Sequence, residues 1–373
     1  MKFEEIYEVK YEVRMKKRQL KSLFFIVLIF CLAMFAAGCG SIAESDDGLQ
    51  NIPTCDQCLS LAVLDVGDAA AQIILVDGYT MVVDVGDSET TDKVEDYLNS
   101  LGVDKLDVVV LSHGHSDHIG GYQALADYPI GTSYISPQQH NTATYEKAMG
   151  VLINNSEKIV VPQVGESFEL GSATVQFLGP EEAEYEDLNN SSLIVRISYG
   201  DTSFLLPGDM EGIEADQMLS RFDNVESDVF VAAHHGSNQD ATNSYILLRE
   251  VNPTDVIISS AGAESEYGFP HEEVLSRIND LCATLYRTDL QGDIVVTSDG
   301  TNLNFNTSGI NSESQAPQGN GLKGDVSYIG NINSKKLHTD DCSGLPAEQN
   351  RVYFNSREAA IAEGYEPCTK CNP

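Results

Sequence analysis

The sequence LSHGHSDHIGG, residues 111–121, places three histidines and one aspartate within six residues, at His113, His115, Asp117 and His118. Imidazole nitrogens and carboxylate oxygens are ligands that divalent cations accept in proteins. Packed together without an ion, the same groups would repel one another or leave polar atoms unsatisfied. The stretch therefore predicts an active site that holds one or two metal ions.

The residues on either side indicate how these ligands are presented. Residues 106–111 form a largely apolar run, typical of a buried strand that leads into a loop. Gly120 and Gly121 follow the ligands and permit close approach of other backbone. A polar histidine-rich loop with no metal is the alternative, and the strand before it and the glycines after it disfavour that interpretation.

Hydrophobic patterning elsewhere predicts a mixture of strands and helices. Strands are expected at residues 61–66, 72–77, 80–85, 106–111, 173–178, 192–198, 202–206, 228–232 and 255–260, and helices at 91–101, 211–222, 243–251 and 271–281. Because no βαβ unit repeats, the pattern favours an α+β fold of packed sheets flanked by helices. Cys282, after the last helix, is expected to be a buried small hydrophobe.

The charge balance restricts the class of partner. The chain of 373 residues has 22 basic and 57 acidic side chains, a formal net charge of -35. Such a surface repels polyanions at long range, so electrostatic steering toward nucleic acid is not expected. A phosphate substrate would have to be held locally by metal cations.

The N-terminal region predicts export. Residues 1–38 contain a basic cluster followed by an uncharged apolar run over 23–38, which is short for a membrane span. The run ends in Ala-Ala-Gly-Cys, which resembles a bacterial lipobox and implies a lipid on Cys39. An uncleaved membrane anchor is the alternative. Both interpretations place the rest of the chain on the extracytoplasmic face of the cell membrane.

Two segments have the composition of connectors. Residues 39–59 are small and polar and predict a tether, and residues 307–326 predict a flexible linker. Cys55 and Cys58 lie in the tether as a CxxC pair. Outside the cell such a pair is expected to be structural, as a disulfide or as half of a metal site.

The pattern His113-x-His115-x-Asp117-His118 resembles the metal motif of the metallo-β-lactamase superfamily, whose αββα sandwich holds one or two metals at one edge. Residues 65–67, 83–86, 189–193, 204–209, 234–237, 267–271 and 286–289 resemble the extracellular domain of ComEC-type competence proteins. The resemblance covers residues 60–306. It does not extend to the membrane-spanning channel of those proteins, so transport is not implied.

The resemblance and the chemistry of the side chains together imply site roles. The implied ligands are His113 and His115 for the first metal, Asp117 and His118 for the second, Asp209 as the bridge, and one of His234 and His235 for the second metal. The other histidine of that pair would face the substrate. Asp117 or Asp209 would orient a metal-activated water, and Asp84 would support a ligand histidine. His271 is a candidate proton donor or, equally, a packing residue at a helix start.

The sequence also departs from the family pattern. Many relatives carry a further histidine before the bridging aspartate, but residues 121–208 offer only His140, far from any ligand-like context. An Asn-Ser segment at 189–192 stands in that interval, so the first metal would be weakly held or completed by water. Ala69 and Ala70 after Asp68, and Phe269 where the family often has histidine, alter the expected substrate contacts.

Residues 327–373 predict a second metal-binding module. The four potential ligands are His338, Cys342, Cys368 and Cys371, whose spacing suits a closed tetrahedral zinc site. The stretch resembles the metal-binding domain of the Ada DNA-repair protein, with a short helix capped by Ser356. His338 replaces the methyl-accepting cysteine, so a role in folding, docking or nucleic-acid contact is favoured over methyl transfer. Disulfides to Cys55 or Cys58 are the alternative.

Together these features predict a lipid-anchored extracytoplasmic hydrolase that uses one or two zinc or manganese ions, with one structural zinc in the C-terminal module. Phosphodiester hydrolysis leads, with DNA as one candidate substrate. A phosphorylcholine-esterase-like or other small-ester activity is the enzyme alternative, and a non-catalytic surface binding protein that retains the fold is another. The membrane is the expected partner, and no protein partner is inferred.

Overall fold

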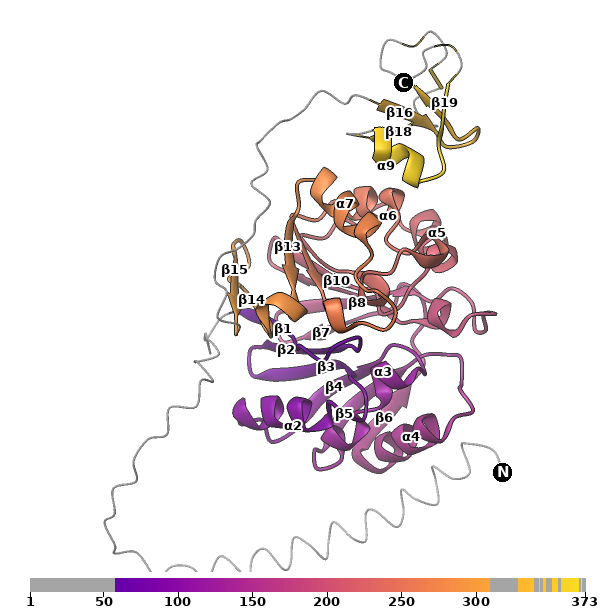
Figure 1. Cartoon of the computed structure of the whole chain (residues 1–373). Helices are drawn as coiled ribbons and strands as arrows, with labels where there is room; N and C mark the ends of the chain where they lie inside the picture. Colours follow the sequence, from indigo (N-terminus) through magenta and orange to yellow (C-terminus); the bar gives the residue numbers. More distant parts are fainter. Residues whose placement is uncertain are drawn as a thin grey trace, which may run out of the picture. The chain divides into compact units, whose positions relative to one another are not determined.

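The computed structural model describes residues 58–308, 328–338, 342, 345–346, 351–354, 357–368 and 370. Residues 58–308 contain two large sheets with helices on their outer faces, as Figure 1 shows. This αββα arrangement confirms the predicted α+β sandwich.

The first sheet has eight strands in the order β15-β14-β1-β2-β3-β4-β5-β6. Its strands are β1 (Leu59–Val63), β2 (Ala71–Val76), β3 (Tyr79–Val85), β4 (Leu106–Leu111), β5 (Ile130–Ile135), β6 (Ser156–Val160), β14 (Ile294–Ser298) and β15 (Leu303–Thr307). Strands β1, β2 and β3 pair antiparallel, whereas β3 to β6 run parallel. The loop with the predicted ligands follows β4, inside the parallel part.

The second sheet has seven strands in the order β13-β12-β11-β10-β9-β8-β7. Its strands are β7 (Ser167–Leu170), β8 (Ala173–Gly179), β9 (Ile194–Tyr199), β10 (Thr202–Leu206), β11 (Val229–Val231), β12 (Asp255–Ile258) and β13 (Thr284–Arg287). Strands β10 to β13 are parallel neighbours. The loops that follow β10, β11 and β12 therefore leave the sheet at one common edge.

Apolar side chains fill the space between the sheets and beneath the helices on both sides. Phe177 and Phe204 belong to the central cluster, which takes residues from both sheets. The α-helices of residues 58–308 are α2 (Thr91–Ser100), α3 (Ser116–Ile119), α4 (Ala143–Asn155), α5 (Gly212–Arg221), α6 (Tyr245–Val251), α7 (Glu272–Asp280) and α8 (Thr288–Gln291). Residues of α2 and α4 cover the first sheet, and those of α5, α6 and α7 cover the second. Each helix thereby buries its one apolar stripe.

Five short 3-10 turns complete the sandwich, at η1 (Tyr122–Leu125), η2 (Leu188–Ser191), η3 (Ala233–Gly236), η4 (Gln239–Ala241) and η5 (Gly262–Glu264). Among the predicted elements that begin later than expected, three do so because their first residues serve other contacts. Ser192 precedes β9 and bonds to site residues, Glu211 precedes α5 and accepts side-chain hydrogen bonds, and Asn243 adopts a left-handed φ of 51° before α6.

Patterning missed several elements, among them β5, α4 and β6, which lie between the ligand loop and β7. Strand β5 contains Gly131 and Ser133, and β6 contains the charged residues Glu157 and Lys158, so neither strand has a clear apolar period. The expectation that Cys282 is buried is wrong. Cys282 is exposed, and it has a left-handed φ of 57° where the chain leaves α7.

The described part of residues 328–370 contains a small four-stranded sheet in the order β18-β16-β17-β19. Its elements are β16 (Tyr328–Asn331), β17 (Lys336–His338), β18 (Arg351–Phe354), α9 (Arg357–Ala362) and β19 (Glu366–Pro367). Ser356, the predicted helix cap, lies outside the described residues. Of the predicted linker at 307–326, Thr307 ends β15 and Ser308 follows it, while the remainder also lies outside the described residues.

Candidate metal centre

The predicted ligands converge at one edge of the sandwich from loops of both sheets. His113 and His115 follow β4, and His118 lies on the single turn of α3. Asp209 follows β10, while His234 and His235 follow β11. A Cβ at Gly121 would collide with the carbonyl of Val85, so the loop can turn back against β3 only with glycine there.

Four side chains form one group of potential ligands. The Nε2 atom of His118 lies 3.0 Å from Asp209 Oδ1 and 3.6 Å from Asp117 Oδ2. The Nε2 atom of His235 lies 3.4 Å from Asp117 Oδ2 and 3.8 Å from Asp209 Oδ1. All four ligand atoms lie within 4.8 Å of one another.

The two histidine nitrogens of this group are buried without a hydrogen-bond partner among the described residues. For His118 the 3.0 Å contact with Asp209 is close enough, but it does not have the direction of a hydrogen bond. Buried polar atoms without a partner are rare in native proteins, and a bound ion is one common reason for them. These residues therefore fit a divalent cation with mixed nitrogen and oxygen ligands.

His113, His115 and Asp209 form a second group of potential ligands. The Nε2 atom of His113 lies 3.0 Å from Nδ1 of His115 and 3.9 Å from Asp209 Oδ2. Burial lowers the pKa of His113 well below its usual range, and it also lowers the pKa of His115. Neutral imidazoles keep a lone pair, which is the form that binds a metal.

In the metal centre, neighbouring charged side chains oppose the effect of burial on the pKa values of Asp209 and His118. Burial raises the pKa of Asp209, but the neighbouring His118 and His235 outweigh burial and hold that pKa well below its usual range. Burial lowers the pKa of His118, yet Asp209 and Asp84 raise it well above its usual value. The protein thus stabilises negative charge on the carboxylate that separates the two groups of ligands.

Side chains behind the ligands fix their rings. Asp84 accepts hydrogen bonds from the backbone N–H of Ser112 at 2.7 Å and from its hydroxyl at 2.7 Å, and it lies 2.8 Å from His118 Nδ1. Ser192 contacts His113 Nδ1 at 3.3 Å and accepts from the Asp209 N–H. The geometry gives Asp84 the supporting place expected for it, whereas Ser112 and Ser192 were not singled out from the sequence because a lone serine carries no spacing signal.

The structure separates the two adjacent histidines. His235 belongs to the group with Asp117, His118 and Asp209, and its Nδ1 lies 3.2 Å from the carbonyl oxygen of Ser259. His234 lies on the other side of Asp209, with Nε2 3.7 Å from Oδ2. Sequence alone left open which of the two would join the second metal.

Two other histidines discussed from the sequence, His271 and His140, lie near the centre but outside both groups of potential ligands. His271 precedes α7, accepts a hydrogen bond from the Asn238 N–H at 2.9 Å and packs edge-on against Phe269. These contacts favour a packing role at the helix start. The expectation that His140 lies far from the ligands is wrong, since its ring centroid is 5.8 Å from that of His115 and its Nδ1 is 3.2 Å from the Gly114 carbonyl oxygen.

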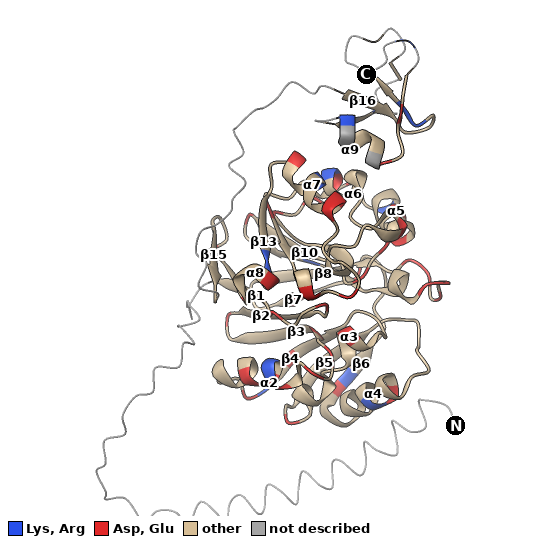
Figure 2. Cartoon of the chain, viewed as in Figure 1, with Lys and Arg blue, Asp and Glu red and all other residues tan. Residues whose placement is uncertain are grey.

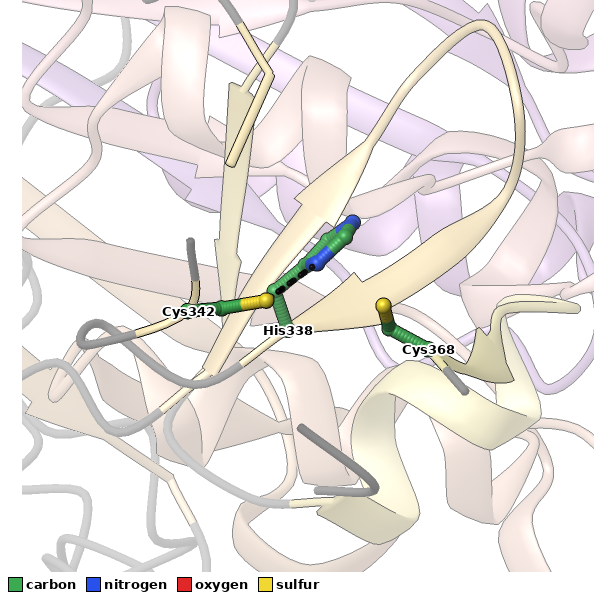
Figure 3. A group of neighbouring side chains, drawn as sticks. All are labelled: His338, Cys342 and Cys368. Carbon is green, nitrogen blue, oxygen red and sulfur yellow. Dashed lines mark hydrogen bonds between the residues drawn. The ribbon is translucent and has the colours of Figure 1, made fainter. Parts of the chain in front are cut away.

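The C-terminal module brings three of its four predicted ligands together. His338, Cys342 and Cys368 offer ligand atoms within 4.8 Å of one another, and Figure 3 shows the three side chains turned toward a common point. His338 Nδ1 lies 3.2 Å from Cys342 Sγ, and the N–H of Lys370 donates to Cys368 Sγ. Backbone N–H donation to sulfur favours the thiolate form that metals bind.

Several predicted residues fall outside the described part of the chain. They are Cys371, Cys39, Cys55 and the whole predicted signal peptide over residues 1–38. Cys58 is disulfide-bonded, in agreement with a structural role. Within the described residues, no helix combines the length and the hydropathy that a membrane crossing requires.

Comparison with known proteins gives two family matches. The model described as the metallo-beta-lactamase superfamily matches residues 66–260, and the model described as the metal binding domain of Ada matches residues 328–373. The second match and the three clustered ligands agree with a metal-binding C-terminal module.

Similar proteins include "Competence protein ComA" of Neisseria gonorrhoeae, 28% identical over 62% of this chain and 31% of that protein. "ComE operon protein 3" of Bacillus subtilis is 28% identical over 53% of this chain and 25% of that protein. The chain thus spans a quarter to a third of these relatives, and the matches agree with the ComEC-type resemblance. Among solved structures, the diiron beta-hydroxylase CmlA of Streptomyces venezuelae matches with a TM-score of 0.44 and 16% identity, over 65% of this chain and 54% of that one.

We expect Asp84→Asn to weaken metal binding at the site by about 10- to 100-fold, because the amide cannot accept both from Ser112 and from His118 as the carboxylate does. Isothermal titration of metal-stripped protein with zinc measures this. The exposed Asp92→Asn on α2 is the matched control. Equal affinity in Asp84→Asn and Asp92→Asn would contradict the role given to Asp84.

For the C-terminal module, we expect Cys368→Ser to remove one equivalent of bound metal, because it deletes one of three clustered soft ligands. Elemental analysis of purified protein measures metal per chain. Cys282→Ser, which alters an exposed thiol away from any ligand group in the described residues, should leave the content unchanged. A loss in both variants or in neither would count against a metal site at Cys368.

Proposed function

We propose, for a chain that belongs to the metallo-β-lactamase superfamily, that residues 58–308 form a metal-dependent hydrolase of phosphodiester bonds. The observation that carries the proposal is the position of Asp209, whose two oxygens each face a separate group of potential ligands. A carboxylate in this position can bridge two cations about 3.5 to 4 Å apart, the separation that suits attack on phosphorus. Zinc and manganese are the ions we propose.

The ligand groups suggest a division of labour within the site. Bound cations would polarise the scissile group and lower the pKa of a coordinated water. Asp117, half-exposed at the rim of its group, is placed to orient that water, while Asp84 and Ser192 hold the ligand rings in position. His113 and Asp209 are almost fully buried, so their side chains are preorganised before substrate arrives.

DNA is the candidate substrate that the relatives favour, since one of them is described as a competence protein. Acidic side chains populate the helices and loops around the sandwich in Figure 2, and the chain carries a net charge of -35. Tight binding to duplex DNA along this surface is therefore disfavoured. We propose that recognition is local, at the metals and at the aromatic residues beside them.

An aromatic wall of Tyr267 and Phe269 leads from solvent to the metal ligands. Tyr267 is 67% exposed and stacks on Phe269, with ring centroids 5.4 Å apart. Phe269 in turn lies 5.4 Å from the ring of His234 and 6.0 Å from that of His235. An exposed aromatic face near a phosphodiester site is suited to stack a nucleobase of single-stranded DNA.

The proposal also covers where the protein is located and which metal the C-terminal module binds. We propose that Cys39 carries a lipid that holds the enzyme on the extracytoplasmic face of the membrane, as the export-type N-terminal sequence suggests. Zinc is proposed for the module because its ligands are two thiolates and an imidazole, with Cys371 as the fourth.

The direct test of the proposed function is hydrolysis of bis-p-nitrophenyl phosphate by metal-loaded protein. We expect turnover that requires zinc or manganese and falls by about 100-fold or more in His115→Ala, because a metal ligand is lost. The exposed Glu146→Gln on α4 is the control. A protein loaded with metal but without metal-dependent turnover would exclude the phosphodiesterase and favour a binding protein.

A second test addresses the substrate. We expect Tyr267→Ala to weaken binding of single-stranded oligothymidine by about 5- to 100-fold, because one base loses its stacking partner, while Tyr267→Phe retains it. Fluorescence anisotropy of labelled DNA measures affinity, and an abasic oligonucleotide should not distinguish Tyr267→Ala from wild type. The exposed Tyr79→Ala on β3 is the control. Similar affinity for oligothymidine in all variants would remove the support that the wall gives to DNA.

A further inference from the structure

The two oxygens of Asp209 have similar surroundings. Oδ1 lies 3.0 Å from His118 Nε2 and 3.8 Å from His235 Nε2. Oδ2 lies 3.9 Å from His113 Nε2 and 3.7 Å from His234 Nε2. Ligands that bind one cation at about 2.0–2.2 Å lie roughly 3 to 4 Å from one another. Each oxygen is thus paired with two imidazoles at distances suited to a shared ion.

A buried carboxylate faces the far side of the His234 ring. Glu211 Oε1 lies 3.6 Å from His234 Nδ1, and Glu211 is only 4% exposed. The side-chain amides of Asn189 and Asn190 donate to its two oxygens at 3.1 Å and 2.8 Å. The carboxylate is too far for a hydrogen bond, but its negative charge favours a proton on Nδ1 and leaves Nε2, which lies 3.7 Å from Asp209 Oδ2, able to bind a metal.

The backbone also directs the two histidines to opposite sides of Asp209. His234 and His235 have left-handed φ values of 48° and 54°, which are uncommon for residues other than glycine. The N–H of His234 donates to the Gly208 carbonyl at 3.1 Å. The Asn243 side chain accepts from Ala233 and donates to the Ala233 and Ser237 carbonyls. These bonds stabilise an otherwise unfavourable turn.

We propose that His234 supplies the third nitrogen ligand of the first metal, together with His113, His115 and Asp209, and that Glu211 is its positioning residue. His234 would thereby supply the third nitrogen that neither ligand group draws from residues 121–208. Asn189 and Asn190 from that interval contribute indirectly, by holding Glu211. His234 lies outside the tight group of His113, His115 and Asp209, but its Nε2 is 3.7 Å from Asp209 Oδ2. The inference rests on the metal centre of the proposed function but not on its substrate.

The test measures metal per chain by elemental analysis after dialysis, and affinity by titration with cobalt(II) followed by visible absorption. His234→Ala should lose one equivalent relative to wild type, and His115→Ala/His234→Ala should lose the same single equivalent. His234→Ala/His235→Ala should lose two. Glu211→Gln should bind the first cation about 10- to 100-fold more weakly, whereas the exposed Glu146→Gln should match wild type. His234→Gln, which preserves side-chain volume, provides a second variant if His234→Ala does not fold.

Retention of both cations at wild-type affinity in His234→Ala or His234→Gln would overturn the inference, and His234 would then be a substrate contact. Loss of a single equivalent in His234→Ala/His235→Ala would also overturn it. A protein that binds both cations as expected but hydrolyses no phosphodiester would contradict the proposed function and leave the assignment of His234 intact.

Discussion

The buried carboxylate of Asp209 is the group on which the arrangement of this molecule depends. Burial alone would favour its protonated form, but His118 and His235 hold its pKa well below the usual range. A desolvated charge of this kind is stable only when opposite charge and hydrogen-bond donors surround it. Ligands from β4, α3 and the loop after β11 must therefore meet at the end of β10, which the packing of two sheets makes possible.

The sandwich provides this meeting point because its core is shared. Phe177 and Phe204 of the second sheet belong to the same apolar cluster as residues of β1, β3 and β4. A close-packed core deforms little, so loops at its edge can hold side chains in fixed positions. The supporting hydrogen bonds of Asp84, Ser192 and Glu211 then fix individual rings. The family match over residues 66–260 covers this arrangement, while the roles of individual ligands remain predictions.

Much of the fold was predictable because the relevant signals are local. The runs that became β2, β4 and β10 are apolar and bounded by turn residues, and α2 has a regular apolar stripe. The missed segments, such as β6 with its Glu-Lys pair, form strands because neighbours pair with them and not because of their own pattern. The sequence pattern also placed Glu211 inside a helix, because helical spacing continues through that residue. Only tertiary contacts show that its side chain lies next to His234.

Residue type and spacing along a loop are local properties, so the superfamily, the metal motif at 113–118 and the three described potential ligands of the C-terminal module could be recognised from the chain alone. The fold was needed to establish which adjacent histidine faces which oxygen of Asp209, that His140 lies against the ligand loop, and that Glu211 stands behind His234. Those relations join loops of separate strands, and the left-handed turn at 234–235 that creates them leaves no periodic signal in the sequence.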